Sequence, residues 1–132
     1  MKSSPSILIV EDDALTRKML CGMLEKLGAA VIEAKDGKEA VDLIRKSPVD
    51  LVLLDASMPR MDGFSACQQI RKLEQGKDVP ILMVTSLADS DSVKRASAAG
   101  VTDFVTKPIS WASLGQLIEQ HIEKSSAVLS SD

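Results

Sequence analysis

Of the five short apolar runs in this sequence, four are followed by residues that could bind a metal ion or transfer a chemical group. These residues are Glu11, Asp12 and Asp13 after the first run, Asp55 after the third, Thr85 and Ser86 after the fourth, and Lys107 after the fifth. Carboxylates placed together repel one another unless a cation neutralises them, and a hard divalent ion with oxygen ligands is the natural partner. A carboxylate beside such an ion can attack phosphorus and form an acyl phosphate. A lysine and a hydroxyl group could then neutralise and hydrogen-bond the transferred group.

The apolar runs must belong to elements that bring these residues together. Five runs alternate with amphipathic segments, which is typical of a parallel sheet with helices on both faces. The expected strands are Ile7 to Val10, Ala30 to Ala34, Asp50 to Leu54, Ile81 to Thr85 and Val101 to Thr106. Ligands of such a sheet bind at the carboxyl ends of its strands, so we expect the polar residues to converge there.

Apolar residues at helical spacing predict a helix after each strand. In the first helix they are Leu15, Met19, Met23 and Leu27, with Gly28 as the stop. Asp36 and Glu39 form a capping box before Ala40, Val41 and Ile44. The remaining helices are expected around Phe64, Cys67, Ile70 and Leu73, over Ser90 to Ala99 with Gly100 as its cap, and around Leu114, Leu117, Ile118 and Ile122.

Each candidate residue also has an ordinary structural interpretation. Asp12 or Asp13 could cap the first helix, and Asp55 could be a turn residue. Thr85 could simply end its strand, and Lys107 could simply be solvated. The coincidence of four strand ends, each with the chemistry that one phosphoryl site requires, favours the functional interpretation.

The motifs resemble the receiver family of response regulators over Ser6 to Lys124, almost the whole chain. The motifs are Ile-Leu-Ile-Val-Glu11-Asp12-Asp13, Leu-Leu-Asp55-Ala-Ser-Met-Pro59-Arg-Met-Asp62-Gly63, Val-Thr85-Ser86 and Phe104-Val-Thr-Lys107-Pro108. The resemblance implies an α/β fold of the flavodoxin-like type, a doubly wound five-stranded parallel sheet in the order 2-1-3-4-5. It also implies a response regulator receiver of a two-component signalling system, which accepts a phosphoryl group from a histidine kinase.

The same resemblance assigns roles at the metal site. Asp55 is the expected phosphoacceptor, and Asp12 is a direct ligand of Mg²⁺, with Mn²⁺ as an alternative ion. Glu11 acts on the metal through water, Asp13 is a flanking acid, and the backbone carbonyl of Ser57 is a further ligand. Catalysis is limited to the domain's own phosphorylation and dephosphorylation, so no turnover of a free metabolite is expected.

Lys107 is expected to pair with the phosphoryl group, and its bond to Pro108 is cis in similar proteins. Thr85 and Phe104 are the expected switch residues, which repack the surface of the fourth helix, fifth strand and fifth helix. Phe104 stands where many receivers carry tyrosine. Trp111 is expected to pack the start of the last helix, and His121 to be a packing or surface residue.

Partners follow from the resemblance. They are a sensor histidine kinase or phosphotransfer protein and a downstream effector. The stretch from Gly100 to Trp111 is similar to receivers joined to cyclic-di-GMP synthase or phosphodiesterase domains. A homodimer that depends on phosphorylation is a further hypothesis.

Three alternatives compete with a phosphoryl-accepting receiver. A degenerate receiver that acts as a phosphorylation-independent interaction module is one, but all the expected site residues are present. A haloacid dehalogenase-type phosphatase would need a second acid where Ala56 and Ser57 follow Asp55. A flavin mononucleotide binder would meet repulsion between its phosphate and the carboxylates after the first strand.

Composition sets the remaining limits. The 132 residues fit one domain, expected over residues 1–124 with a serine-rich tail or linker over residues 125–132. The net charge of -3 shows no basic patch, so direct nucleic-acid binding is not expected. Cys21 and Cys67 do not suggest a disulfide scaffold, and no apolar run is long enough for a signal peptide or membrane span. A soluble, cytoplasmic domain without membrane contact is the expectation.

Overall fold

The computed structural model describes residues 4–58, 61–86 and 90–125 of the chain. The elements are β1 (Ser6–Val10), α1 (Ala14–Lys26), β2 (Ala30–Ala34), α2 (Gly37–Lys46), β3 (Leu51–Asp55), α3 (Gly63–Lys72), a short 3₁₀ turn η1 (Glu74–Gly76), β4 (Ile81–Thr85), α4 (Ser90–Ala99), β5 (Asp103–Thr106) and α5 (Trp111–Ser125). The predicted tail lies outside the described residues, except Ser125, which ends α5.

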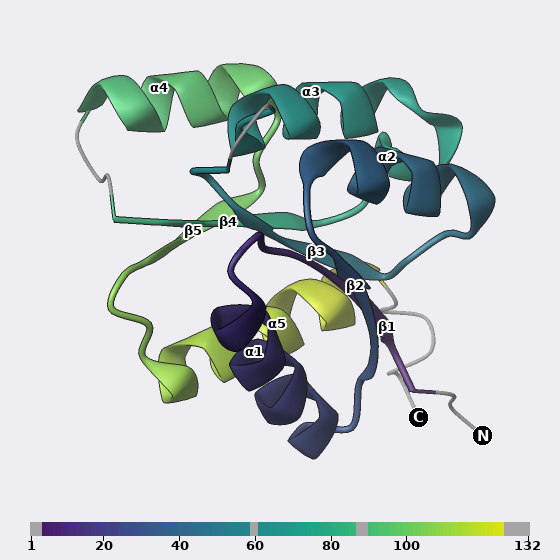
Figure 1. Ribbon diagram of the computed structural model, residues 1–132, viewed down its shortest axis with the longest axis vertical. Coiled ribbons are helices and arrows are strands. Elements are labelled where there is room, and N and C mark those ends of the chain that lie inside the picture. The colour runs from purple at the N-terminus through teal and green to yellow at the C-terminus, as the bar shows by residue number, and fades with distance from the viewer. Residues whose placement is uncertain (1–3, 59–60, 87–89, 126–132) are drawn as a thin grey trace.

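The five strands form one parallel sheet in the order β2-β1-β3-β4-β5, which confirms the predicted fold. In this register Val10 lies beside Leu54, Asp55 beside Val84 and Thr85 beside Thr106. The carboxyl ends of β1, β3, β4 and β5 therefore lie along one edge of the sheet (Figure 1). The chain order reverses between β1 and β3, where a ligand crevice is expected.

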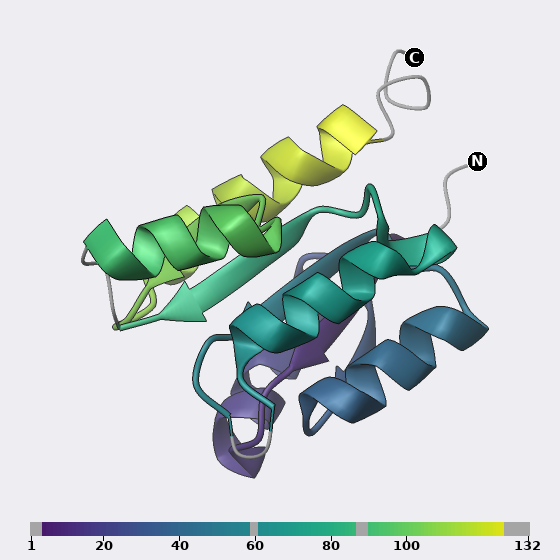
Figure 2. The same ribbon diagram turned by 90° about the horizontal axis from the view of Figure 1, so that it is seen from above.

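Helices cover both faces of the sheet. Figure 1 shows α2, α3 and α4 on one face and α1 and α5 on the other; Figure 2 gives the view from above. Side chains alternate between the two layers along each central strand: in β3, Val52 and Leu54 join the core under α2, α3 and α4, whereas Leu51 and Leu53 join the core under α1 and α5. Both β3 and β4 are buried along their whole length, as their continuous aliphatic runs predict.

The predicted apolar stripe of the first helix is wrong for three of its four residues, whereas the fourth, Met23, packs against the core. Leu15 is 71% exposed, Met19 53% and Leu27 48%. The buried residues of α1 are instead Leu20, Cys21 and Leu24. Four-residue steps advance about 400° around a helix with 3.6 residues per turn, so the line from Leu15 to Leu27 winds around α1 and leaves the core face.

The helix ends follow the predicted signals. Asp13, rather than Asp12, caps α1, because its side chain accepts a hydrogen bond from the backbone N–H of Thr16. The side chain of Asp36 likewise accepts from Glu39 N–H, and Glu39 in turn accepts from the backbone N–H of Lys35.

Gly28 and Gly100 follow α1 and α4 with φ of 93° and 95°, which is the backbone conformation that favours glycine at a helix stop. The fifth strand is shorter than predicted and begins at Asp103, because Val101 N–H still bonds back to Ala96 of α4.

The predictions for two residues of α5, His121 and Trp111, have different outcomes. His121 is buried, with Nε2 3.3 Å from Oδ2 of Asp103, so its interpretation as a packing residue is confirmed. Trp111, the first residue of α5, is 41% exposed and lines a hollow with Met19 and Met23 of α1, and its role in packing the start of α5 stays a prediction. No helix in the described part of the chain is long and apolar enough to cross a membrane.

Candidate functional site

Three acidic side chains from two neighbouring strands meet at the carboxyl edge of the sheet. Glu11 and Asp12 follow β1, and Asp55 is the last residue of β3. Their carboxylates each offer an oxygen within 4.8 Å of the other two. The β1–β3 pairing accounts for this meeting, because Val10 and Leu54 are register partners and the residues after them must lie side by side. The predicted convergence of Glu11, Asp12 and Asp55 is therefore found in the structure.

The three acids differ in exposure. Glu11 is 5% exposed and Asp55 4%, whereas Asp12 is exposed. The pKa of Glu11 is raised from 4.5 to about 7, mainly by burial and also by the Asp55 charge and a hydrogen bond with Asp12, whereas the Asp13 N–H and Lys107 oppose the rise. The pKa of this carboxyl group is raised because burial and the neighbouring acids disfavour its charged form, and the positive charge nearby does not offset them.

Lys107 supplies one positive charge to the site from the end of β5. Its Nζ lies 3.3 Å from Oδ1 of Asp55, and its side chain is 38% exposed. Its backbone N–H donates to the carbonyl of Thr85 at 2.9 Å, which fixes the ends of β4 and β5 together. Lys107 is thus paired with Asp55 rather than merely solvated. Its bond to Pro108 is cis, as predicted.

The loop after Asp55 is held close to the acidic cluster. The backbone N–H of Ser57 lies 3.4 Å from Oδ1 of Asp55, and Gly63 N–H donates to the carbonyl of Ala56 at 2.9 Å. A Cβ at Gly63 would overlap the carbonyl oxygen of Asp55, so glycine lets α3 begin directly against the end of β3. Asp62 caps this helix through Ser65 N–H. The role of the Ser57 carbonyl stays a prediction.

The two predicted switch residues lie on neighbouring strands beside this site. Thr85 is buried at the end of β4, and Phe104 is half-buried on β5, where it packs against the core under α2, α3 and α4. Thr85 therefore reaches the same edge as Asp55 and Lys107. Their movement on phosphorylation stays a prediction.

The donor set of this site fits a hard divalent cation. Glu11, Asp12 and Asp55 are all oxygen donors, and Mg²⁺ prefers one or two carboxylates together with water and phosphate oxygens. The raised pKa of Glu11 points the same way, because a bound cation would favour its charged form. Cys and His ligands, which would suit Zn²⁺, do not take part in the cluster among the described residues.

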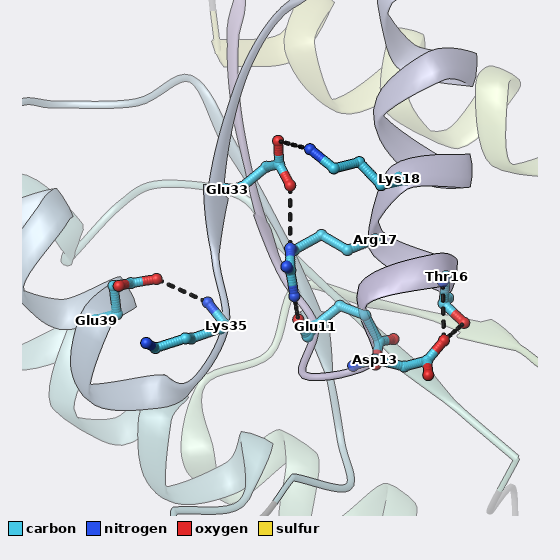
Figure 3. Close-up of polar contacts among 8 residues, drawn as sticks. All are labelled: Glu11, Asp13, Thr16, Arg17, Lys18, Glu33, Lys35 and Glu39. Atoms are coloured by element: carbon cyan, nitrogen blue, oxygen red, sulfur yellow. Dashed lines mark hydrogen bonds and ion pairs between the residues drawn. The ribbon is translucent and has the colours of Figure 1, made fainter.

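Two residues beside the site were not singled out in the sequence. Arg17 of α1 donates from Nε to Glu33 of β2 at 3.0 Å and from a terminal nitrogen to the backbone carbonyl of Glu11 at 2.8 Å (Figure 3). The signal that could have found them is a glutamate inside an otherwise apolar strand, which needs a cationic partner. Arg17 is the fourth residue of the preceding helix and is well placed to provide one.

Comparisons with known proteins agree with this geometry. The family model described as the response regulator receiver domain matches residues 7–119. A probable transcriptional regulator, ycf27, of Guillardia theta is 40% identical over 83% of this chain and 42% of its own length. An uncharacterised 14.6 kDa protein of Leptolyngbya boryana is 36% identical over 87% of this chain and 88% of its own. This chain thus spans less than half of the ycf27-type relative.

Solved structures show the same architecture. The chemotaxis protein CheY4 of Vibrio cholerae has 30% identity and a TM-score of 0.86, over 89% of this chain and 98% of that one. The receiver domain of a Pseudomonas aeruginosa sensor histidine kinase, with magnesium in its active-site cleft, has 32% identity and a TM-score of 0.85, over 91% and 98%. With its fold, its acidic cluster and its family match in agreement, this chain belongs to the receiver domain family of response regulators.

Proposed function

We propose that Asp55 is the phosphoacceptor of this receiver domain, with a phosphohistidine of a sensor kinase or phosphotransfer protein as donor. A carboxylate oxygen of Asp55 attacks phosphorus, the new O–P bond forms, and the P–N bond breaks with its electron pair leaving on the histidine nitrogen. Phosphoryl acceptance of this kind is typical of the family. Receiver domains are signalling modules rather than metabolic enzymes, and the reaction we propose modifies only the domain itself.

One observation carries the assignment of Asp55. Among the three clustered acids, it is the one that is buried, lies at the end of a central strand and also contacts a lysine, at 3.3 Å. That lysine can move its contact from the carboxylate to the phosphoryl oxygens, because a carboxylate that becomes an acyl phosphate loses its own charge. Glu11 is equally buried, but its carboxylate accepts the N–H of Asp13 at 3.0 Å instead of pairing with that lysine.

The other residues at this edge have complementary roles. Glu11, Asp12 and Asp55 would hold Mg²⁺, or Mn²⁺ in its place, together with the Ser57 carbonyl. The ion supplies positive charge that offsets the charge of the transferred phosphoryl group. Thr85, buried at the end of β4, provides the hydroxyl that bonds a phosphoryl oxygen and links the site to Phe104.

The rival proposal of a degenerate, phosphorylation-independent module gains no support from this geometry. Degeneracy would be expected to leave an acid missing or the lysine turned away from the acceptor. Here three carboxylates converge and Lys107 is paired with Asp55.

The output of the domain is proposed at the level of chemistry and partners. We propose a cytoplasmic domain over residues 1–124, which passes its signal to an effector through α4, β5 and α5. One similar structure, at 30% identity and a TM-score of 0.80, is the receiver domain of a modulated diguanylate cyclase from Desulfovibrio desulfuricans. It supports a cyclic-di-GMP synthase as the effector class we propose, with a phosphodiesterase as the alternative. Sedimentation with and without beryllofluoride tests phosphorylation-dependent dimerisation, which an unchanged monomer would contradict.

The phosphoacceptor assignment is tested by intact-mass spectrometry after incubation with acetyl phosphate and Mg²⁺. The wild type should gain one phosphoryl group, chelation of the metal should abolish the gain, and Asp55→Asn should gain nothing. The matched control is Asp50→Asn, an aspartate at the opposite end of the same strand. Modification of Asp55→Asn at the wild-type rate would overturn the assignment.

A further inference from the structure

The backbone N–H, the carboxylate and the backbone carbonyl of Glu11 each form a hydrogen bond with a different part of the domain. Its backbone N–H donates to the carbonyl of Ala34 in β2 at 3.1 Å. Its carboxylate accepts the N–H of Asp13 at 3.0 Å. Its backbone carbonyl accepts a guanidinium N–H of Arg17 at 2.8 Å. The first two bonds hold the strand end and the side chain, so the third is the one that acts on the turn leading to Asp12.

That carbonyl matters because it belongs to the peptide plane that joins Glu11 to Asp12. The plane is rigid, so a bond to its oxygen restricts the rotations on both sides and with them the direction of the Asp12 side chain. Glu11 and Asp55 are buried and are held by packing, whereas Asp12 is exposed and is held by its backbone and its hydrogen bond with Glu11. Arg17 can therefore orient Asp12, which is the acid whose position depends most on the backbone.

Arg17 is itself fixed from its other side. Its Nε lies 3.0 Å from Oε1 of Glu33, and its side chain is only 17% exposed. Glu33 also accepts from Lys18 at 3.4 Å, and although burial opposes it, bonds from Arg17, Cys21 and Lys18 lower the pKa of Glu33. Figure 3 shows the guanidinium between Glu33 and Glu11. Since Glu33 already pairs with its charge, Arg17 acts on the site through position more than through charge.

We propose that Arg17, held by Glu33, is a positioning residue for the metal-binding carboxylates. The proposal rests on the proposed function, because it concerns the same Mg²⁺ site. Mg²⁺ demands near-ideal octahedral geometry, so a small displacement of one carboxylate is costly. The three acids also repel one another within 4.8 Å, and without the brace the exposed Asp12 would turn away from the cluster in the metal-free protein.

The test is calorimetric titration of the whole domain with Mg²⁺ at pH 8. Arg17→Met should raise the dissociation constant about tenfold, the lower end of the usual effect of a residue that orients metal ligands. The matched control is Lys18→Met, which removes the other cation on Glu33 but has no bond to Glu11. It should bind as the wild type does. Arg17→Lys keeps the charge but has one nitrogen on a shorter side chain in place of the two nitrogens that contact Glu33 and the Glu11 carbonyl, so it should stay weakened.

A second measurement separates positioning from general destabilisation. In metal-free protein, exchange of the Asp13 amide hydrogen should be faster in Arg17→Met than in Lys18→Met, because that amide donates to Glu11. If Arg17→Met does not fold, Glu33→Gln replaces it. Glu33→Gln keeps a side-chain oxygen that can accept from Arg17 but removes the carboxylate charge, so its loss of Mg²⁺ affinity should be smaller than that of Arg17→Met.

The outcomes distinguish the two proposals. Wild-type protein that binds no Mg²⁺ would refute the metal site and with it the proposed function. Wild-type protein that binds Mg²⁺, with Arg17→Met binding equally well, would refute only the positioning role. Recovery of full affinity in Arg17→Lys would also refute it, since charge alone would then be sufficient.

Discussion

The buried carboxyl group of Glu11 should make the metal-free domain less stable as pH rises. Its pKa is about 7 in the folded protein against an ordinary value of 4.5, mainly because of burial. The folded state therefore holds this proton more tightly than the unfolded state. The resulting contribution to stability is fully present below pH 4.5, falls as pH rises, and is lost above pH 7.

The size of the effect follows from the two pKa values. The difference between 4.5 and about 7 corresponds to at most about 3 kcal/mol, at 1.36 kcal/mol per pH unit. Glu11→Gln has no titrating proton, yet its side-chain oxygen can still accept the N–H of Asp13. The variant should match the wild type near pH 4.5 and exceed it by up to about 3 kcal/mol at pH 8 in the absence of metal.

Urea unfolding followed by circular dichroism, in EDTA at pH 5, 6, 7 and 8, measures this difference. The difference between the free energies of unfolding of Glu11→Gln and the wild type at each pH cancels the contributions of titrating groups that both proteins share. Glu74→Gln, which removes an exposed carboxylate beyond α3, controls for the loss of one negative charge. Mg²⁺ should stabilise the wild type more at pH 8 than at pH 6, because protons compete with the ion. Parallel pH curves for wild type and Glu11→Gln would refute the reasoning.

Four other substitutions test packing and caps. Leu20→Ala should lower the free energy of unfolding by about 2–5 kcal/mol, whereas Leu15→Ala on the exposed side of the same helix should change it by less than about 0.5 kcal/mol; equal losses in urea unfolding would contradict the described core face. Gly63→Ala should lower both the melting temperature and the rate of phosphorylation by acetyl phosphate, because its Cβ would overlap the carbonyl of Asp55; an unchanged rate would show that the loop adapts freely. Asp36→Ala should cost about 1 kcal/mol through its lost cap while leaving that rate unchanged, and slowed phosphorylation would contradict a purely structural role.

The sheet could be predicted because its strands are buried on both faces. A continuous run such as Leu51 to Leu54 has few alternatives to a central parallel strand, and the strand ends then determine where polar residues meet. That is why the convergence of Glu11, Asp12 and Asp55 could be predicted although Glu11 and Asp55 lie far apart in the sequence.

Details that depend on three-dimensional packing were less predictable. In α1, apolar residues occur both on the core face and on the exposed line from Leu15 to Leu27, and composition alone does not separate them. Trp111 was expected to pack the start of α5, but how much of its surface is covered there depends on the neighbouring elements. The bond from Arg17 to the Glu11 carbonyl also escaped prediction, since backbone acceptors leave no trace in the sequence.

The pairing of Lys107 with Asp55 joins residues that are 52 positions apart, and it has a consequence for how the domain matures. The site requires β1, β3, β4 and β5 to be docked in register, and such distant contacts form late because chain entropy must be overcome first. During synthesis Asp55, the proposed acceptor, is made well before Lys107. A chain that is incomplete or misaligned is therefore a poor phosphoryl acceptor, so competence for phosphorylation also reports that folding is complete.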